Sequence, residues 1–250
     1  MQRSIAIDIG NTRIKVGFFE SASLLETTQS THWEEIWPAI SQFAPQATII
    51  SSVKPVADVW LTQLQKIQPT VCLLDYQLPL PIQNHYGTPH TLGMDRVAGV
   101  VGGQFLYPNQ AILVIDAGTC ITYDYLNPAG EYQGGIISPG LQMRAKAMHE
   151  FTAKLPLLSA DILTKPNPAL TGNNTQEAMA SGVFWGIVAE MNGIIEMYQS
   201  DNQQLKVLIT GGDAIFFETK LKPLIFAHPN LILTGLFRIL QYNVAPKNKQ

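Results

Sequence analysis

The sequence has few of the features that mark disulfide-bonded or metal-binding proteins. Only two cysteines, Cys72 and Cys120, occur in 250 residues, and neither stands in a CxxC pair or at a spacing typical of zinc ligands. The five histidines form no HExxH pattern. These absences argue against a disulfide framework, a structural zinc site and a zinc hydrolase.

Charged residues are also scarce. They make up 14% of the chain, against about 25% in an average globular protein. The 16 basic and 19 acidic residues leave a net charge of −3, so no basic excess favours nucleic acid or an anionic membrane. Apolar residues reach 46%, which excludes a disordered chain. The low charge suggests that a partner subunit covers part of the surface.

Long hydrophobic runs are missing as well. The first twenty residues alternate as a strand does and lack the apolar centre of a signal peptide. No uninterrupted run of about 18 apolar residues occurs, so we expect no membrane span. The expectation is a soluble, cytoplasmic protein.

Short apolar runs alternate with helix-like stretches, which predicts an α/β layer fold. The predicted strands are two within 3–20, then 47–53, 70–74, 111–116, 120–126, 131–138 and 205–210. The predicted helices are 33–43, 56–67, 93–106, one from Pro139-Gly140 with Met143, Ala147 and Phe151 on one face, 174–199, 214–222 and 234–243. The tail from Pro246 is polar and expected to fray.

Two features stand out in the second half. The connection 152–173 is longer than most and is typical of a lid, a binding loop or a partner arm. The helix predicted next has Asn174 and Glu177 at the spacing of a capping box. Ala178, Gly182 and Gly186 then recur every four residues, so another helix or a ligand can approach that face closely.

The sequence repeats one pattern. AIDIGNTRIKVG at 6–17 and VIDAGTCITYDY at 114–125 both give an apolar strand, Asp-x-Gly, a threonine and a second strand. Such an echo predicts two similar halves, which we place at 1–110 and 111–250.

Each copy offers a site for phosphate. Glycine at a hairpin turn lets backbone N–H groups approach an anion, and Asn11, Thr12, Arg13 and Lys15 add donors and charge. Asp8 suits hydrated Mg²⁺, which prefers carboxylate and phosphate oxygens. The alternative is an ordinary turn with aspartate as a turn former. No GxxxxGK[ST] or GxGxxG occurs, so P-loop and dinucleotide-binding folds lack their fingerprints.

The second copy runs from Asp116 to Thr119. If the two turns faced each other across a cleft, they would bracket the β- and γ-phosphates of a nucleotide, with Thr119 donating and Asp116 holding a cation. Cys120, which follows, has no nearby histidine in the sequence and is interpreted as a small core residue rather than a nucleophile.

A third group is Gly93-Met94-Asp95-Arg96. The helix dipole favours the ionised form of Asp95, which can then accept a hydrogen bond or a proton from a substrate hydroxyl. The fork of Arg96 suits a carboxylate or phosphate. The alternative is a capping aspartate beside a solvated arginine. Tyr86 is either a packed aromatic residue or part of a binding site. The turn Gly211-Gly212-Asp213 is either a simple strand–helix connection or a place where a nucleoside can approach.

Taken in order, AIDIGNTRIKVG, YGTPHTLGMDRVAG, IDAGTCITYD, GGIISPGL, NTQEAMASG and TGGD resemble the type III pantothenate kinase family, which also contains proteins first named Bvg accessory factors. The resemblance runs from residue 5 to about 240. It implies the fold of the acetate and sugar kinase, heat-shock chaperone and actin superfamily. That fold is α/β, with two similar actin-like (ribonuclease H-like) halves, each a mixed sheet flanked by helices, and the active-site cleft between them.

The resemblance also implies ATP-dependent phosphorylation of pantothenate to 4'-phosphopantothenate, the first step of coenzyme A synthesis. The implied cofactors are Mg²⁺ with ATP and a monovalent cation, K⁺ or NH₄⁺, on Asp116. The implied catalytic base is Asp95. The implied ATP-binding residues are Asp8, Ile9, Gly10, Asn11, Thr12, Arg13, Ile14, Lys15 and Thr119. The implied pantothenate-binding residues are Tyr86, Gly93, Met94, Asp95, Arg96 and Thr175.

In the family the threonine matching Thr175 is supplied across a dimer interface, which implies a homodimer. The TGGD glycines match the family's adenosine motif. Cys120 departs from the usual alanine, and we expect no loss of activity because cysteine is only slightly larger. Two alternatives stay open: a kinase of another small hydroxylated acceptor, and a non-catalytic nucleotide-binding regulator of the same fold.

Overall fold

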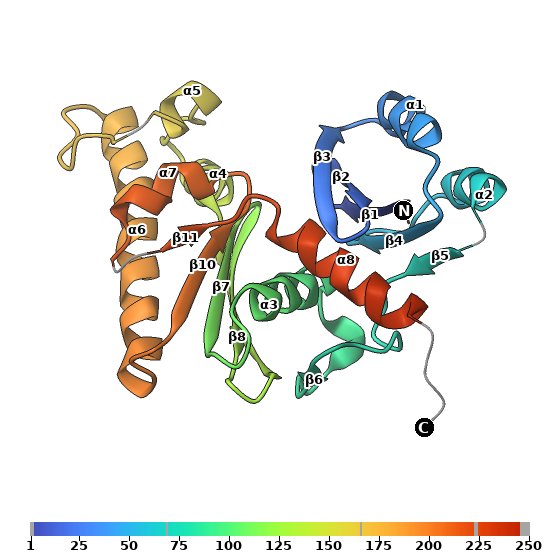
Figure 1. Ribbon diagram of the computed structural model, residues 1–250. Coiled ribbons are helices and arrows are strands. Elements are labelled where there is room, and N and C mark those ends of the chain that lie inside the picture. The colour runs from blue at the N-terminus through green and yellow to red at the C-terminus, as the bar shows by residue number, and fades with distance from the viewer. Residues whose placement is uncertain (1–2, 69, 166, 223–224, 246–250) are drawn as a thin grey trace. The chain divides into compact units, whose positions relative to one another are not determined.

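The computed structural model describes residues 3–68, 70–165, 167–222 and 225–245 (Figure 1). Its contacts divide the chain into two compact units. The first holds Met1–Asn109, Leu126–Gly134 and Asn230–Gln250, and the second holds Gln110–Tyr125 and Gly135–Pro229. The predicted domains, 1–110 and 111–250, stay a prediction, because compact units of contact need not be the segments that fold as domains. The tail predicted to fray from Pro246 lies outside the described residues.

The first unit is built on a mixed sheet with the strand order β3-β2-β1-β4-β5 in the described part of the chain. These strands are β1 (Arg3–Ile9), β2 (Ile14–Glu20), β3 (Ser23–Ser30), β4 (Ala47–Ser52) and β5 (Thr70–Leu73). β1 pairs antiparallel with β2 and parallel with β4. The sequence analysis missed β3, because this strand is mostly polar and exposed and lacks the alternation that marks a half-buried strand.

Alternation along β2 sends side chains to two different layers of helices. Phe18 packs edge-on against Phe43 of α1, with ring centroids 5.1 Å apart. Phe19, the next residue, stacks on Phe237 of α8 at 4.1 Å. Successive side chains of a strand point to opposite faces, so α1 and α8 cover opposite faces of this sheet (Figure 1).

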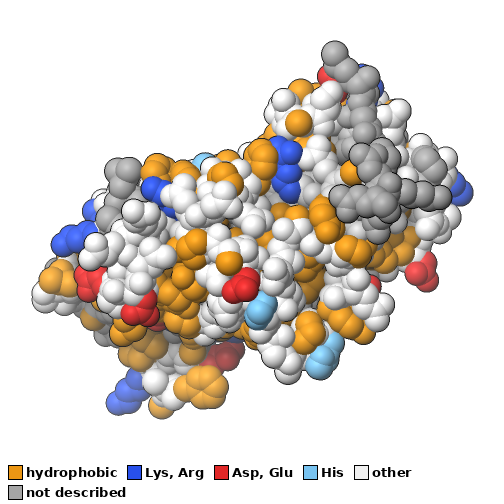
Figure 2. All heavy atoms as spheres, turned by 60° about the horizontal axis from the view of Figure 1, so that its bottom comes forward, with side chains coloured by type: hydrophobic (Ala, Val, Ile, Leu, Met, Phe, Trp, Pro, Cys, Tyr) orange, Lys and Arg blue, Asp and Glu red, His pale blue; other side chains and the backbone are white. Residues whose placement is uncertain are grey.

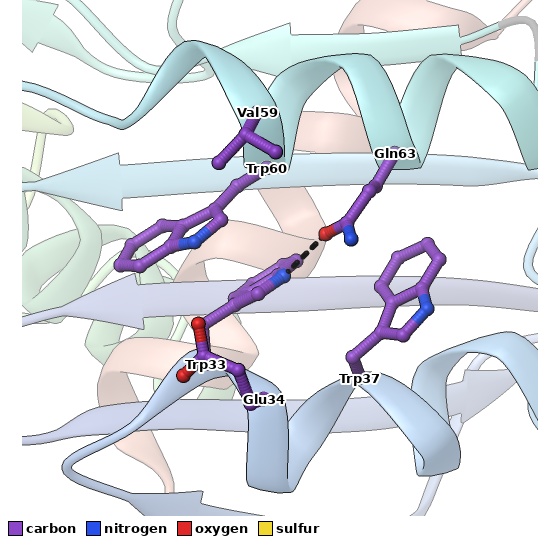
Figure 3. Close-up of a pocket in the computed structure, with 6 residues that line it drawn as sticks. All are labelled: Trp33, Glu34, Trp37, Val59, Trp60 and Gln63. Carbon is purple, nitrogen blue, oxygen red and sulfur yellow. Dashed lines mark hydrogen bonds between the residues drawn. The ribbon is translucent and has the colours of Figure 1, made fainter.

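The helix layer on one face of this sheet consists of α1 (Trp33–Phe43) and α2 (Asp58–Ile67), which bury an isoleucine-rich core against the sheet. A stack of indole rings joins the two helices (Figure 3). Trp33 lies 4.9 Å from Trp60, centroid to centroid, and its Nε1 donates to Gln63 Oε1 at 2.7 Å. The buried indole N–H therefore has a partner, as such a group requires.

The layer on the other face consists of α3 (Met94–Leu106) and α8 (Leu231–Val244). The two helices pack closely because glycines stand at their contact. A β-carbon at Gly102 would lie 2.5 Å from the Leu231 carbonyl oxygen, and one at Gly235 would overlap the Ala98 carbonyl. α8 also contacts β1, β2 and β4, so the last helix of the chain completes the first unit.

The second sheet has the order β11-β10-β7-β8-β9-β6 in the described part of the chain. Its strands are β6 (Gln83–Asn84), β7 (Ile112–Ala117), β8 (Cys120–Leu126), β9 (Glu131–Pro139), β10 (Lys206–Thr210) and β11 (Phe226–Ala227). The series β9-β8-β7-β10-β11 repeats the order β3-β2-β1-β4-β5, which confirms the α/β fold of two similar halves. β6 is an addition, and it pairs with Glu131 and Tyr132 at the start of β9.

The helices of the second unit agree broadly with the sequence. They are α4 (Leu141–Glu150), α5 (Ala160–Leu163), α6 (Thr175–Asp201) and α7 (Ala214–Phe217), with a short 3-10 turn at Glu218–Lys220; another 3-10 turn, Pro89–Thr91, lies in the first unit. Phe151 lies beyond the end of α4 and is 85% exposed, so its predicted place on the helix face is wrong. The long connection before α6 contains α5, and the predicted helix 214–222 is α7 followed by a 3-10 turn.

α6 begins at the predicted cap. Asn174 Oδ1 accepts a hydrogen bond from Glu177 N at 3.0 Å, and Glu177 Oε2 accepts one from Asn173 N at 3.1 Å. The return bond therefore reaches one residue before the cap, unlike a standard capping box.

By length and composition α6 could cross a membrane, which differs from the sequence expectation of no such segment. Half of its most apolar window is buried inside the unit, where it contributes Val183, Phe184, Ile187 and Met191 to the core. The core helix of a globular protein passes the same test, so the finding by itself is weak. Figure 2 shows that charged side chains are few on one face of the molecule and that apolar ones are scattered among polar ones.

The close packing of α3 and α8 gives a stability prediction. Gly235→Ala should lower the free energy of unfolding by about 1–3 kcal/mol, because the new methyl group must push α8 away from α3. Thr234→Ala on the same helix should change it by no more than about 0.5 kcal/mol. Urea unfolding of the two variants tests this, and equal stabilities would contradict the proposed crowding at Gly235.

Candidate active site

The first Asp-x-Gly turn lies where β1 runs into β2. Gly10 N donates to Arg13 O at 3.0 Å, which closes a turn over residues 10–13. Asn11, Thr12 and Arg13 are exposed at its tip, while Asp8 is half-buried and lies opposite Lys15 on β2. The turn therefore presents polar side chains and backbone amides at the carboxyl end of β1.

Two residues assigned to this turn face inward. Ile9 and Ile14 are 1% and 3% exposed and belong to the core beneath α1 and α2. Their side chains hold the turn on the sheet, so only their backbone atoms are available to a ligand. On the other side of β1, Ser51 of β4 lies opposite Asp8 in the parallel register. The sequence analysis did not single out Ser51, although a Ser-Ser pair ending an apolar strand is a visible signal.

The second Asp-x-Gly turn lies between β7 and β8. Gly118 N donates to Cys120 O at 3.0 Å, and Thr119 is exposed. Gly140, at the start of α4, supports this turn: its N donates to Thr119 O at 3.1 Å, and a β-carbon there would lie 2.5 Å from the same oxygen. Residue 140, at the predicted helix start Pro139-Gly140, must therefore be glycine, because the backbone of Gly118 and Thr119 leaves no space for a β-carbon. Cys120 is half-buried and not disulfide-bonded.

Glycines also border the carboxylate of Asp116. A β-carbon on Gly118 would lie 3.6 Å from Asp116 Oδ1, and one on Gly211 would overlap that oxygen and the Ala117 carbonyl. Gly211 has φ +98°, a backbone conformation that favours glycine. The TGGD turn therefore folds against the first residues of the second Asp-x-Gly turn, and Asp213 N donates to Ala117 O at 2.9 Å. Burial raises the pKa of Asp213.

An ion pair beneath this turn holds α4 in place. Arg144 Nη2 lies 2.5 Å from Glu190 Oε2, and Arg144 Nε donates to Pro139 O at 2.8 Å. Tyr123 OH donates to Glu190 Oε1 at 2.9 Å. Burial and the neighbouring Glu190 carboxylate raise the pKa of Tyr123. Burial alone would raise the pKa of Glu190, but the hydrogen bonds from Arg144, Ser138 and Tyr123 bring it below its usual value.

The start of α3 positions Asp95. Gly93 is the N-cap, and Arg96 N donates to Asp95 Oδ1 at 2.9 Å. A β-carbon on Gly93 would lie 2.5 Å from that oxygen, so glycine is needed for the carboxylate to stand there. Asp95 is half-buried in the first turn, where the helix dipole favours its charged form. Met94 is the first residue of the same helix.

Arg96 is 8% exposed, and this differs from the solvated arginine of the alternative interpretation. Its guanidinium carbon lies 5.6 Å from the centroid of the Tyr86 ring. The Tyr86 ring in turn lies 6.2 Å from Tyr132, nearly parallel to it. Tyr86, predicted from a separate segment, thus lies beside Arg96 of the Gly93–Arg96 group in the first unit, while Tyr132 was missed because its strand position reads as core.

Thr175 is the exposed first residue of α6, in the second unit. The same unit contains Asp116, Thr119 and the TGGD turn, whereas the turn at 8–15 and the Tyr86–Arg96 cluster belong to the first unit. Among the described residues no group of three or more His, Cys, Asp or Glu side chains is placed to hold a metal ion.

Known proteins resemble this chain over nearly its whole length. The model of the family described as type III pantothenate kinase matches residues 4–197. A curated relative of that name from Phocaeicola vulgatus is 42% identical over 242 residues, which cover 96% of this chain and 98% of the relative. Another of that name from Cytophaga hutchinsonii is 42% identical over 241 residues, covering 96% of this chain and all of the relative.

Solved structures agree on the fold. A Campylobacter jejuni protein described as a Baf family transcriptional activator superposes with a TM-score of 0.60 at 22% identity, covering 96% of this chain and 98% of that one. A ROK hexokinase from Thermus thermophilus superposes with a TM-score of 0.56 at 12% identity, covering 97% and 100%. At these identities the likeness establishes the actin-like fold of sugar kinases alone.

The match of the family model to most of the chain and the 42% identity of full-length relatives lead to one conclusion. This chain belongs to the type III pantothenate kinase family.

Proposed function

We propose that this protein transfers the γ-phosphoryl group of ATP to the hydroxyl group of pantothenate, giving 4'-phosphopantothenate and ADP at the start of coenzyme A synthesis. The family membership supports the reaction. The observation that carries it onto this chain is the placement of Asp95, whose Oδ1 is fixed by Arg96 N at a helix start beside the Arg96–Tyr86 pair.

Asp95 is proposed to face the substrate hydroxyl. As the hydroxyl oxygen bonds to the γ-phosphorus, the bond from that phosphorus to the ADP oxygen breaks, and the hydroxyl proton passes to the Asp95 carboxylate. Because phosphoryl transfer has a loose transition state, the main task of Asp95 is to hold the oxygen in line. Arg96 is suited to the pantothenate carboxylate through its planar fork, and Gly93, Met94 and Tyr86 would line the pocket.

The two Asp-x-Gly turns are proposed to bind the phosphates of ATP. The Gly10 N–H is used within its own turn, so the available donors are the exposed side chains of Asn11, Thr12 and Arg13 with the amides around them. Thr119 offers its hydroxyl from the second turn. Lys15 adds positive charge beside Asp8.

The residues present fit the cations that the family implies. Without a three-ligand cluster in the described chain, a divalent ion would draw most of its oxygen ligands from phosphate and water, as Mg²⁺ prefers, with Asp8 as the protein carboxylate nearby. Asp116 would hold K⁺ or NH₄⁺, and the missing side chain of Gly211 lets its carboxylate stand close to the Ala117 carbonyl, a second oxygen of the kind these cations take. Bound cations would supply neutralisation of the phosphate charge.

We further propose a cytoplasmic homodimer that pairs through α6. Gly182 and Gly186 are exposed, and a β-carbon on either would meet nothing within 4 Å inside the chain. This face allows a second helix to approach closely, and Thr175 at its start would then reach the partner's pantothenate pocket.

Asp95→Asn should lower kcat by about 10²-fold or more, because an amide cannot receive the hydroxyl proton. ADP formation that depends on added pantothenate measures this. Asp58→Asn, the same change in the first turn of α2, should leave kcat unchanged. A wild-type rate in Asp95→Asn would remove Asp95 from its role. The proposed reaction would be contradicted if the wild-type protein phosphorylated another acceptor but not pantothenate, or if it phosphorylated no acceptor.

Activity should depend on K⁺ or NH₄⁺, and this dependence should be lost when Asp116 is changed. At constant ionic strength set with choline chloride, replacing K⁺ should lower kcat/KM by roughly tenfold or more, and Asp116→Asn should have low activity in both media. Asp161→Asn, on α5 of the same unit, should keep the full response to K⁺. A K⁺ response in Asp116→Asn equal to that of the wild type would contradict the assignment.

Gly186→Trp should prevent dimerisation, since the indole would fill the space that a second helix needs. Light scattering should give the wild type twice the 27.5 kDa chain mass and the variant a single chain mass. The monomeric variant should also be less active than the wild type, because Thr175 would no longer reach the partner. Thr219→Trp, exposed elsewhere in the second unit, is the control. A fully active wild-type monomer would contradict this proposal.

A further inference from the structure

Gly134 lies on β9 at a place where a side chain would meet the Tyr86 ring. A β-carbon built on Gly134 lies 3.2 Å from Tyr86 Cδ2, closer than ordinary van der Waals contact, and 3.4 Å from Cε2, at the near limit of such contact. Gly134 and Tyr132 are two residues apart on the strand, both are buried, and Gln133 between them is exposed. Residues i and i+2 of a strand share a face, so both positions are directed at Tyr86.

The backbone of Tyr86 is fixed, so a clash could be relieved only by the side chain. Tyr86 N donates to Asn84 Oδ1 at 3.0 Å, and His85 N donates to Tyr132 O at 3.0 Å. The bond from His85 continues the pairing of β6 with the start of β9, while the bond from Tyr86 is local to its own segment. The segment that carries Tyr86 is therefore joined to the strand that carries Gly134.

The Tyr86 ring also has little room to turn. Tyr132, which is fully buried, packs along it at 6.2 Å, and the Arg96 guanidinium lies 5.6 Å from its centroid. A ring displaced from Gly134 would change its contacts with these two groups. Arg96 and Asp95 are adjacent on α3, so a displaced ring alters the pocket beside the proposed acceptor site.

We propose that Gly134 is a positioning residue for pantothenate: its missing side chain sets where the Tyr86 ring stands beside Arg96. This inference rests on the proposed function. Gly134 touches no substrate in this account and acts only through Tyr86. The expected signature is a change in pantothenate binding with little change in ATP binding.

Gly134→Ala is the test, and Gly130→Ala is its matched control. Both glycines have positive φ, +96° and +78°, so alanine is strained at each. At Gly130 the new methyl group would meet Gln104 Nε2 at 2.7 Å, the movable end of a side chain, rather than a ring of the pocket. We expect Gly134→Ala to raise the pantothenate KM by about fivefold while the ATP KM and kcat stay within about twofold. Gly130→Ala should change none of the three beyond about twofold.

A double-mutant cycle with Tyr86→Ala separates positioning from general strain. Once the ring is gone, adding Gly134→Ala should raise the pantothenate KM by less than about twofold. Titration calorimetry of pantothenate without turnover should give the same pattern in Kd, and this readout also serves if a variant loses activity.

Three outcomes would overturn the inference: an unchanged pantothenate KM in Gly134→Ala, an equal rise in Gly130→Ala, or effects that multiply in the double variant. If the wild type itself neither binds nor phosphorylates pantothenate, the proposed function fails instead, and the two failures are therefore distinguishable.

Discussion

The absence of a β-carbon at a few glycines determines the orientation of two carboxylates, those of Asp95 and Asp116. Asp95 can direct its carboxylate over the start of α3 because Gly93 has no side chain to occupy that space. Asp116 is bordered in the same way by Gly118 and Gly211. A carboxylate that is close to backbone on several sides has few orientations, and the roles proposed for Asp95 and Asp116 would use this preorganisation.

The same constraint extends into the scaffold. Gly140 brings the start of α4 against the Gly118-Thr119 turn, and the Arg144–Glu190 pair secures α4 from below. In the first unit Gly235 and Gly102 bring α8 and α3 together, and α3 carries Asp95 at its first turn. These helices are thus packed through backbone contacts, which allow less adjustment than contacts between long side chains.

The two sheets share one strand order and differ in what is added to it. In both, an Asp-x-Gly turn follows a central strand at the edge where parallel strands end, which is where ligands of α/β sheets commonly bind. The first unit adds β6 and the segment that carries Tyr86, while the second adds the long α6 and the TGGD turn. The repeat therefore explains why Asp-x-Gly turns occur in a pair, and the additions are where the two units differ.

The sequence by itself determined the α/β class, the repeated Asp-x-Gly turns, the cap of α6 and the family, because these depend on local patterns of spacing and turn chemistry. It also placed Asp95 and Arg96 at the start of a helix, and their role as site residues stays a prediction. It missed β3, whose polar face gives no periodic signal, and it placed Phe151 on a helix that ends before it.

Only the tertiary structure decided that α8 completes the first unit, that Ile9 and Ile14 face the core, and that Gly134 and Tyr132 stand against Tyr86. These facts arise from contacts between segments far apart in the chain. A local pattern cannot report them, because the neighbour that gives a glycine or a tyrosine its role is chosen by strand pairing and helix packing.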